Sequence, residues 1–226
     1  MNFALDDAYF TYRYVRNIAL GRGFVYNPGE WVLGTTTPLY SVGLALGTAI
    51  SGLDVHVIGT IICAISLWLC AGFLFEIGES NDRLIAVSIS LIFLTNPFLH
   101  LFLGMESFLL VSLLVITCWA YERGYRRLTI VLNGLLILVR LEMILFPAVI
   151  VILEVIRTNN IPPWLFLSLL PLCVWGLYSF AVFRSPIPLS ASAKLLSPKI
   201  PFLLGFVVIW YRTISENPLL ITTLVF

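Results

Sequence analysis

The most informative stretch of this chain is VHVIGTIICAISLWLCAGFLF, residues 55–75. It contains no Asp, Glu, Lys or Arg. A helix needs about 20 mainly apolar residues to cross the hydrocarbon core of a bilayer. This stretch is long enough, and we therefore predict a transmembrane helix here.

The composition of the whole chain is that of a membrane protein. Of the 226 residues, 60% are hydrophobic and 11% are charged, and the mean hydropathy is +1.00. Soluble domains are about 45–50% apolar and about 25% charged. The net charge is +1 and there is no basic tract, so nothing in the sequence indicates nucleic acid as a partner. The four cysteines lie singly inside apolar runs, without the spacing of a metal site.

Other apolar runs predict the rest of the architecture. We expect spans at 84–103, at 162–183 and from 218 onward, and shorter apolar helices at 39–51, 108–121, 128–139 and 143–156. The run at 39–51 is too short to cross a bilayer, so it should lie in the interface or dip in and return. The predicted fold class is all-α, as a polytopic transmembrane helical bundle.

The predicted organisation is one membrane domain over residues 1–226. Residues 1–54 form the first extracytoplasmic loop, and residues 55–226 form the transmembrane core. We expect the chain to be a fragment that lacks an N-terminal span and several C-terminal spans.

The external loop is predicted to begin with an amphipathic surface helix. Asp6 or Asp7 can cap its N-terminus, and Gly21 and Gly23 end it. Apolar residues share one face and polar residues another: Ala8, Tyr12, Val15 and Ala19 against Arg13, Arg16 and Asn17.

A small hairpin is predicted to follow this helix. Residues 24–26 and 31–33 would be its strands. The connection at 27–30 contains Pro28 and Gly29 at its two central positions, which suits a type II turn.

If each apolar run crosses the membrane in turn, the unusual polar residues are all predicted to lie on the same side of the membrane. They come from separate loops: Asp6, Asp7, Glu106, Arg140, Glu142 and Lys194. The short loop with Arg123, Arg126 and Arg127 falls on the other side, which the positive-inside rule assigns to the cytoplasm. The convergence of the first group predicts a site on the extracytoplasmic side.

The acidic members of this group have two interpretations each. Asp6 and Asp7 can be a helix cap with a solvated neighbour, or they can bind a divalent cation or supply a general base. Glu106 can mark an interfacial loop, but an acidic residue near hydrocarbon is costly and usually functional.

The basic residues of this group, Arg140 and Lys194, also have two interpretations each. Arg140 can form an anchoring pair with Glu142, or its forked donors can bind a phosphate. Lys194 can extend to the interface as a snorkelling lysine, or it can add to a phosphate site.

Several short motifs bring these residues together in a familiar order. They are LDDAYF at 5–10, NPGE at 27–30, GTTTPL at 34–39, GMES at 104–107, LVRLE at 138–142, and RSPIP at 184–188 followed by AK at 193–194. Together they resemble the C-class (GT-C) membrane glycosyltransferases, and most closely the bacterial branch that includes the terminal arabinofuranosyltransferases. The chain departs from that pattern at Ser107, where Thr is usual, and at Leu141, where Pro is usual.

The resemblance implies an enzyme, an inverting glycosyltransferase of the bacterial cytoplasmic membrane. It would move a sugar from a polyprenyl-phosphate-linked donor to a glycan, lipid or protein on the extracytoplasmic face, with membrane lipids around it. Asp6 or Asp7 would be the catalytic base, and Glu106 would position the acceptor or a metal. Arg140 would bind the donor phosphate.

Further residues are expected to support that site. Lys194 would add to the phosphate-binding group, and Arg13 and Glu142 would support it. A divalent cation, Mg or Mn, is an expected cofactor, with Asp6, Asp7 and Glu106 as its candidate ligands.

Two other functions are compatible with the same residues. A transporter or lipid-sugar flippase would use acidic residues as ion or proton sites. A non-catalytic membrane fragment would need none of them.

Overall fold

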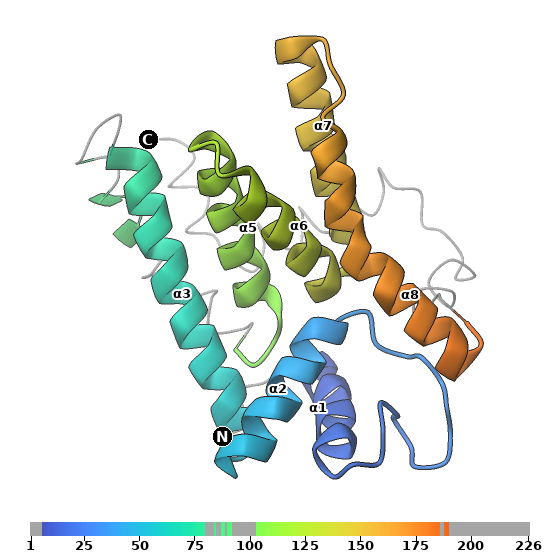
Figure 1. Ribbon diagram of the computed structural model, residues 1–226. Coiled ribbons are helices and arrows are strands. Elements are labelled where there is room, and N and C mark those ends of the chain that lie inside the picture. The colour runs from blue at the N-terminus through green and yellow to red at the C-terminus, as the bar shows by residue number, and fades with distance from the viewer. Residues whose placement is uncertain are drawn as a thin grey trace, which may run out of the picture. The chain divides into compact units, whose positions relative to one another are not determined.

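The computed structural model describes residues 6–79, 84, 87, 88, 90, 91, 103–185, 188 and 189, with side chains from Ala8 onward. These residues belong to a compact unit that covers Met1–Ser190. Every regular element in the described ranges is a helix, which confirms the all-α prediction there (Figure 1). In chain order the principal elements are α1 (Asp6–Ala19), α2 (Pro38–Ser51), α3 (Val55–Glu79), α5 (Ser107–Glu122), α6 (Arg126–Val139), η2 (Leu141–Ile144), α7 (Leu145–Thr158), η3 (Pro163–Leu169) and α8 (Leu170–Phe183).

Within the residues that the structure describes, two segments are long and apolar enough to cross a membrane, Val55–Gly78 and Pro163–Phe183. They match the spans predicted from residue 55 and from residue 162. Large apolar side chains on α3 face outward, and Trp68 is 75% exposed. These features indicate association with a membrane. The span predicted at 84–103 lies largely outside the described residues, and the one from 218 lies wholly outside them.

The helices α3, α5 and α6 lie side by side in that order (Figure 1). The connection between α5 and α6 is short, and Gly124 takes a positive φ of 73° in it. The helix α6 also packs against η3 and α8. Gly134 allows this close approach, because a Cβ there would lie 2.7 Å from Cγ of Pro171.

The amphipathic helix predicted at the N-terminal end is present as α1. Ala8, Tyr12 and Val15 are buried, and Arg13 is exposed, as the pattern predicted. The prediction for Asn17 is wrong, because this residue is buried and does not lie on the exposed polar face. Its side-chain amide donates hydrogen bonds to the carbonyl oxygens of residues 25 and 26, at 2.8 and 2.9 Å, which satisfies it inside the protein.

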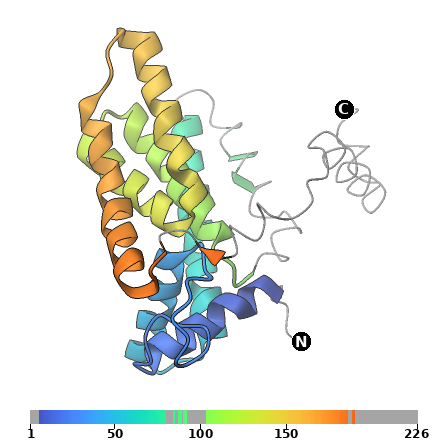
Figure 2. The same cartoon turned by 90° about the vertical axis from the view of Figure 1, so that its right-hand side faces the viewer.

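The predicted hairpin is wrong, because residues 24–26 and 31–33 are not strands. The turn between them is present: the Glu30 N–H donates to the Asn27 carbonyl at 3.1 Å, and Gly29 has a φ of 90°. Side chains of α1 hold the two arms in place of a strand ladder. The Tyr14 hydroxyl donates to the Val32 carbonyl at 3.1 Å. Figure 2 shows the loop beside α1.

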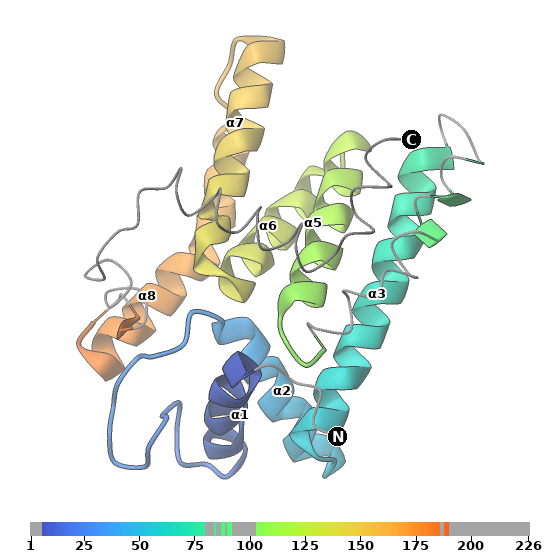
Figure 3. The same cartoon turned by 180° about the vertical axis from the view of Figure 1, so that it is seen from behind.

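The helices α1 and α2 pack on each other, as Figure 3 shows from behind. Their shared core contains Tyr12, Tyr40 and Leu44, and Ile58 of α3 completes it. The helix α2 further contacts α6. The helices α1 and α2 therefore contact the apolar helices near the start of α3 and the end of α6. The motif that contains Arg140 lies at this end of α6.

Candidate functional site

The site begins with the turn before α5, at Gly104. Its carbonyl oxygen accepts two hydrogen bonds, from the Tyr12 hydroxyl at 3.0 Å and from the Tyr40 hydroxyl at 2.9 Å. Gly59 leaves room for this arrangement, because a Cβ there would lie 3.1 Å from the Tyr12 oxygen and 3.6 Å from the Gly104 Cα. Two buried phenols thus fix the turn against α1, α2 and α3.

Both phenols remain protonated over a wide pH range. Burial is the main reason that the pKa of Tyr12 rises to about 12. Burial also raises the pKa of Tyr40 far above its usual value, with negative groups nearby, including Glu106, adding to the effect. The two hydroxyls therefore stay hydrogen-bond donors to Gly104.

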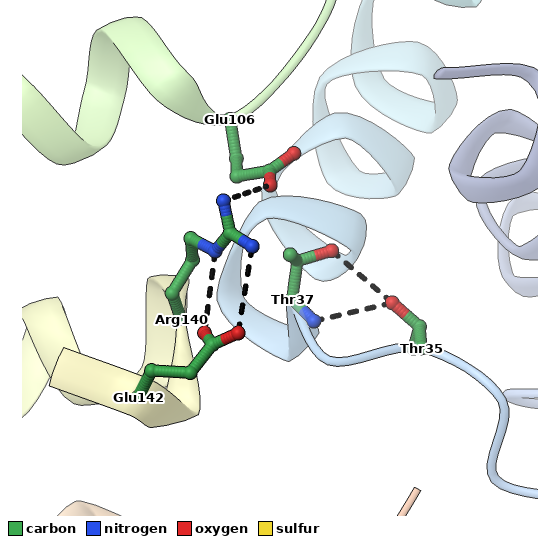
Figure 4. Close-up of polar contacts among 5 residues, drawn as sticks. All are labelled: Thr35, Thr37, Glu106, Arg140 and Glu142. Carbon is green, nitrogen blue, oxygen red and sulfur yellow. Dashed lines mark hydrogen bonds and ion pairs between the residues drawn. The ribbon is translucent and has the colours of Figure 1, made fainter. Parts of the chain in front are cut away.

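Fixing this turn determines where Glu106 lies. Glu106 stands at the N-cap position of α5, but its side chain makes no capping hydrogen bond. The residue is 6% exposed, and its Oε1 lies 3.6 Å from Nη1 of Arg140 (Figure 4). A buried carboxylate needs such a partner, because burial of an unpaired charge is expensive.

Arg140 lies at the C-terminal end of α6, where the backbone becomes extended at a φ of −146°. Its Nε donates to Oε2 of Glu142 at 3.3 Å, and its Nη2 donates to Oε1 at 3.5 Å. The anchoring pair between Arg140 and Glu142, one of the two interpretations of these residues, is therefore present. The guanidinium is held between two carboxylates, one buried and one 57% exposed.

The segment before α2 brings two further polar residues to the cluster. Thr35 and Thr37 are buried, and their hydroxyl oxygens lie 3.1 Å apart. The Thr37 N–H also donates to the Thr35 hydroxyl, at 3.2 Å. In Figure 4 Thr37 lies between Thr35 and the Glu106–Arg140 pair, consistent with the packing of α2 on α6. Both threonines belong to the GTTTPL motif at 34–39, and this run of polar residues directly before Pro38 is the sequence feature that could have predicted a role for them.

The aspartates begin the first helix, as predicted, since α1 starts at Asp6. The side chains of Asp6 and Asp7 lie outside the described residues. Ala8, directly after them, belongs to the core cluster against which Met105 also packs. The start of α1 and the turn that contains Glu106 therefore share one core.

Two other predicted residues lie elsewhere or outside the description. Arg13 donates from Nε to the Tyr26 carbonyl at 3.1 Å and from Nη2 to Oδ1 of Asn27 at 2.7 Å. Its recorded partners are thus in the loop after α1, not at Glu106. Lys194 lies outside the described residues.

A metal site is not assembled by the described side chains alone. Among them, no three His, Cys, Asp or Glu residues come close enough together to hold an ion. The expected ligand set includes Asp6 and Asp7, whose side chains are not described, so the cation stays a prediction. At Glu106 such an ion would have to share the carboxylate with Arg140.

The arrangement combines an oriented guanidinium, a buried carboxylate and a pair of threonine hydroxyls. A guanidinium in this setting can bind a carboxylate or phosphate through two parallel hydrogen bonds. No protein-family model, no curated protein and no solved structure matches this chain, so a function has to be argued from its motifs and from this geometry.

Proposed function

We propose that this chain is the core of a polytopic membrane enzyme that transfers a sugar from a polyprenyl-phosphate donor, with inversion. The observation in its favour is the 3.6 Å contact between Glu106 and Arg140. It joins two motifs that are far apart in the sequence and that the resemblance assigns to one site. The GTTTPL motif lies beside them, through Thr35 and Thr37.

Arg140 is proposed to receive the donor phosphate. Its contact with Glu142 lies near the surface, and such exposed pairs contribute little to stability. A phosphate can therefore take the place of Glu142, while the buried Glu106 keeps the guanidinium oriented. As the bond between the sugar and the phosphate breaks, negative charge grows on the leaving phosphate, and Arg140 would stabilise it.

The base is proposed to be Asp6 or Asp7. A carboxylate can take the proton of the acceptor hydroxyl as that hydroxyl attacks the sugar. A single in-line attack on the face opposite the phosphate inverts the configuration. Support comes from the core that Ala8 and Met105 share, because Ala8 directly follows Asp7 and Met105 directly precedes Glu106.

The proposed setting is the bacterial cytoplasmic membrane, crossed several times, with the site on the extracytoplasmic face. The apolar segments Val55–Gly78 and Pro163–Phe183 support the membrane location. Lys194, which follows α8 in the sequence, is proposed to add to the phosphate-binding group.

The test is sugar transfer in membranes from a panel of polyprenyl-phosphate donors. We would compare the wild type with Asp6→Asn, Asp7→Asn, Glu106→Gln and Arg140→Gln at equal expression. Loss of a general base typically lowers the rate by about 10²–10⁴-fold. Arg140→Gln should weaken donor binding as well as the rate, because its partner is the donor phosphate.

Glu76→Gln and Arg126→Gln are the matched controls, because both residues are exposed and lie away from the cluster. Both should retain wild-type transfer. If both aspartate variants are as active as the wild type, the assignment of the base is wrong. If the wild type moves donor lipid across the bilayer without transferring sugar, the flippase interpretation is correct.

A further inference from the structure

A second feature of the structure is an open groove of about 810 Å³ along α1. Tyr9, Arg13 and Arg16 line it from α1, and Arg22 lines it from the turn that follows. None of the Glu106, Arg140 and Glu142 side chains contributes to it. The groove therefore lies apart from the cluster of Glu106, Arg140 and Glu142.

The lining of the groove has an excess of positive charge. Its described lining residues include three arginines, Arg13, Arg16 and Arg22, and one acidic residue, Asp54. That carboxylate already has a structural use, since its Oδ1 accepts a hydrogen bond from the His56 N–H at 2.8 Å at the start of α3. The groove is thus electrostatically suited to an anion.

The arginines differ in how they are held. Arg13 is fixed by hydrogen bonds to Tyr26 and Asn27, and its guanidinium lies 4.5 Å from the centroid of the Tyr26 ring. Within the described part of the chain, the side chains of Arg16 and Arg22 have no hydrogen bond or ion pair. Their donors are available to a ligand, next to an arginine that is already oriented.

The position of the groove indicates the source of the anion. Its lining includes Asp54 and Val55, and Val55 is the first residue of the apolar segment Val55–Gly78. The first residue of a span lies where the hydrocarbon core meets the polar headgroups. Tyr9 and Tyr26 on the lining suit the same depth, because tyrosine is enriched at this boundary. The anion available there is the phosphate of a lipid headgroup.

We propose that this groove binds the phosphate of an anionic phospholipid headgroup, through Arg16 and Arg22 beside the fixed Arg13. The site holds the N-terminal helices against the membrane surface. It takes no part in the transfer reaction, and its occupancy does not depend on that activity.

The experiment measures lipid binding to the full chain in a neutral detergent by native mass spectrometry. The probes are short-chain phosphatidylglycerol, short-chain phosphatidylcholine and inorganic phosphate. The test variant is Arg16→Gln/Arg22→Gln. It should bind phosphatidylglycerol about thirtyfold more weakly than the wild type does, since each basic residue near a membrane surface contributes about a fivefold factor.

Arg126→Gln/Arg127→Gln is the matched control, because it removes the same charge from exposed positions at the start of α6. It should bind as the wild type does, and Arg16→Lys/Arg22→Lys should retain most of the affinity. The proposal is overturned if the control loses as much affinity as the test variant, or if the test variant loses none. It is also overturned if phosphatidylcholine binds as tightly as phosphatidylglycerol. Equal competition by inorganic phosphate would rule out a lipid site.

Discussion

At the scale of single residues, two ion pairs in this structure have the same length but different surroundings. Glu106 and Arg140 lie 3.6 Å apart, with side chains 8% and 34% exposed. Glu76 and Arg123 also lie 3.6 Å apart, but both side chains are 52% exposed. Both side chains of the second pair are about half exposed, whereas the buried Glu106 depends on its partner. The two pairs should therefore respond differently to the same substitution.

We expect Arg140→Gln to lower the free energy of unfolding by about 1–3 kcal/mol, because it leaves the Glu106 carboxylate buried without its partner. Arg123→Gln should cost less than about 0.5 kcal/mol, as exposed pairs do. Denaturant unfolding of the detergent-solubilised chain measures both. The double variant Glu106→Gln/Arg140→Gln should recover part of the loss. Equal costs for Arg140→Gln and Arg123→Gln would contradict this prediction.

The buried phenol of Tyr12 predicts a dependence of stability on pH. Its pKa is about 12 in the folded protein, against about 10 for a solvated tyrosine. The folded state therefore holds this proton more tightly. The resulting stabilisation is complete below about pH 10 and is lost as the pH rises towards 12.

The measurement is the thermal midpoint of the wild type and of Tyr12→Phe between about pH 9 and pH 12. The wild type should lose stability faster than Tyr12→Phe over the upper two pH units. Tyr14 and Tyr40 are present in both proteins, so their titration cancels in the difference. Parallel curves over the whole interval would show that Tyr12 does not titrate in this way.

At the scale of elements, the packing of α6 on η3 and α8 depends on one small residue. A Cβ at Gly134 would lie 2.7 Å from Pro171 Cγ and 3.3 Å from the Ser168 carbonyl oxygen. A proline ring and a backbone carbonyl have little freedom to move aside. Gly72 in α3 and Gly176 in α8 have nothing within 4 Å of such a Cβ.

We expect Gly134→Ala to destabilise the protein by about 1–3 kcal/mol, because it forces the two elements apart. Gly72→Ala and Gly176→Ala should be neutral or should stabilise by up to about 1 kcal/mol, since alanine favours the helix. Unfolding in denaturant compares the three variants directly. If Gly134→Ala is as stable as the controls, α6 and α8 are not in close contact at this point.

At the scale of the whole molecule, the central question is the surroundings of the outward face of α3. Trp68 lies near the middle of the apolar segment Val55–Gly78 and is 75% exposed. Ile50 is 84% exposed, but it lies at the end of α2, outside both apolar segments. If lipid surrounds α3, a charged residue should be costly at position 68 and tolerated at position 50.

We expect Trp68→Lys to reduce membrane insertion strongly, because a lysine at the centre of a span costs about 2.5–3.5 kcal/mol. Ile50→Lys should have little effect on insertion. The fraction of chain that resists alkaline extraction from membranes measures both. In water, replacing an exposed side chain changes stability by at most about 0.5 kcal/mol. A Trp68→Lys variant that inserts like the wild type would therefore argue against a bilayer around α3.

Local features of the sequence were enough to predict most of the described helices. The lengths of the apolar runs predicted α3 and the Pro163–Phe183 segment. The aspartates and glycines around α1 predicted its two ends, and Pro28 with Gly29 predicted the turn after it. These predictions hold because such features depend on residues only a few positions apart in the chain.

Contacts between distant residues could not be obtained in this way. Residues 24–26 and 31–33 are short apolar runs on either side of a turn, as in a hairpin. The helix α1 instead supplies hydrogen bonds through Asn17 and Tyr14, and no ladder forms. Counting the membrane crossings put Glu106 and Arg140 on one side, yet their 3.6 Å contact follows from the turn at Gly104 and the end of α6. The groove with Arg16 and Arg22 likewise needs α1, α2 and α3 together. Such contacts depend on how the helices pack, which local sequence patterns do not specify.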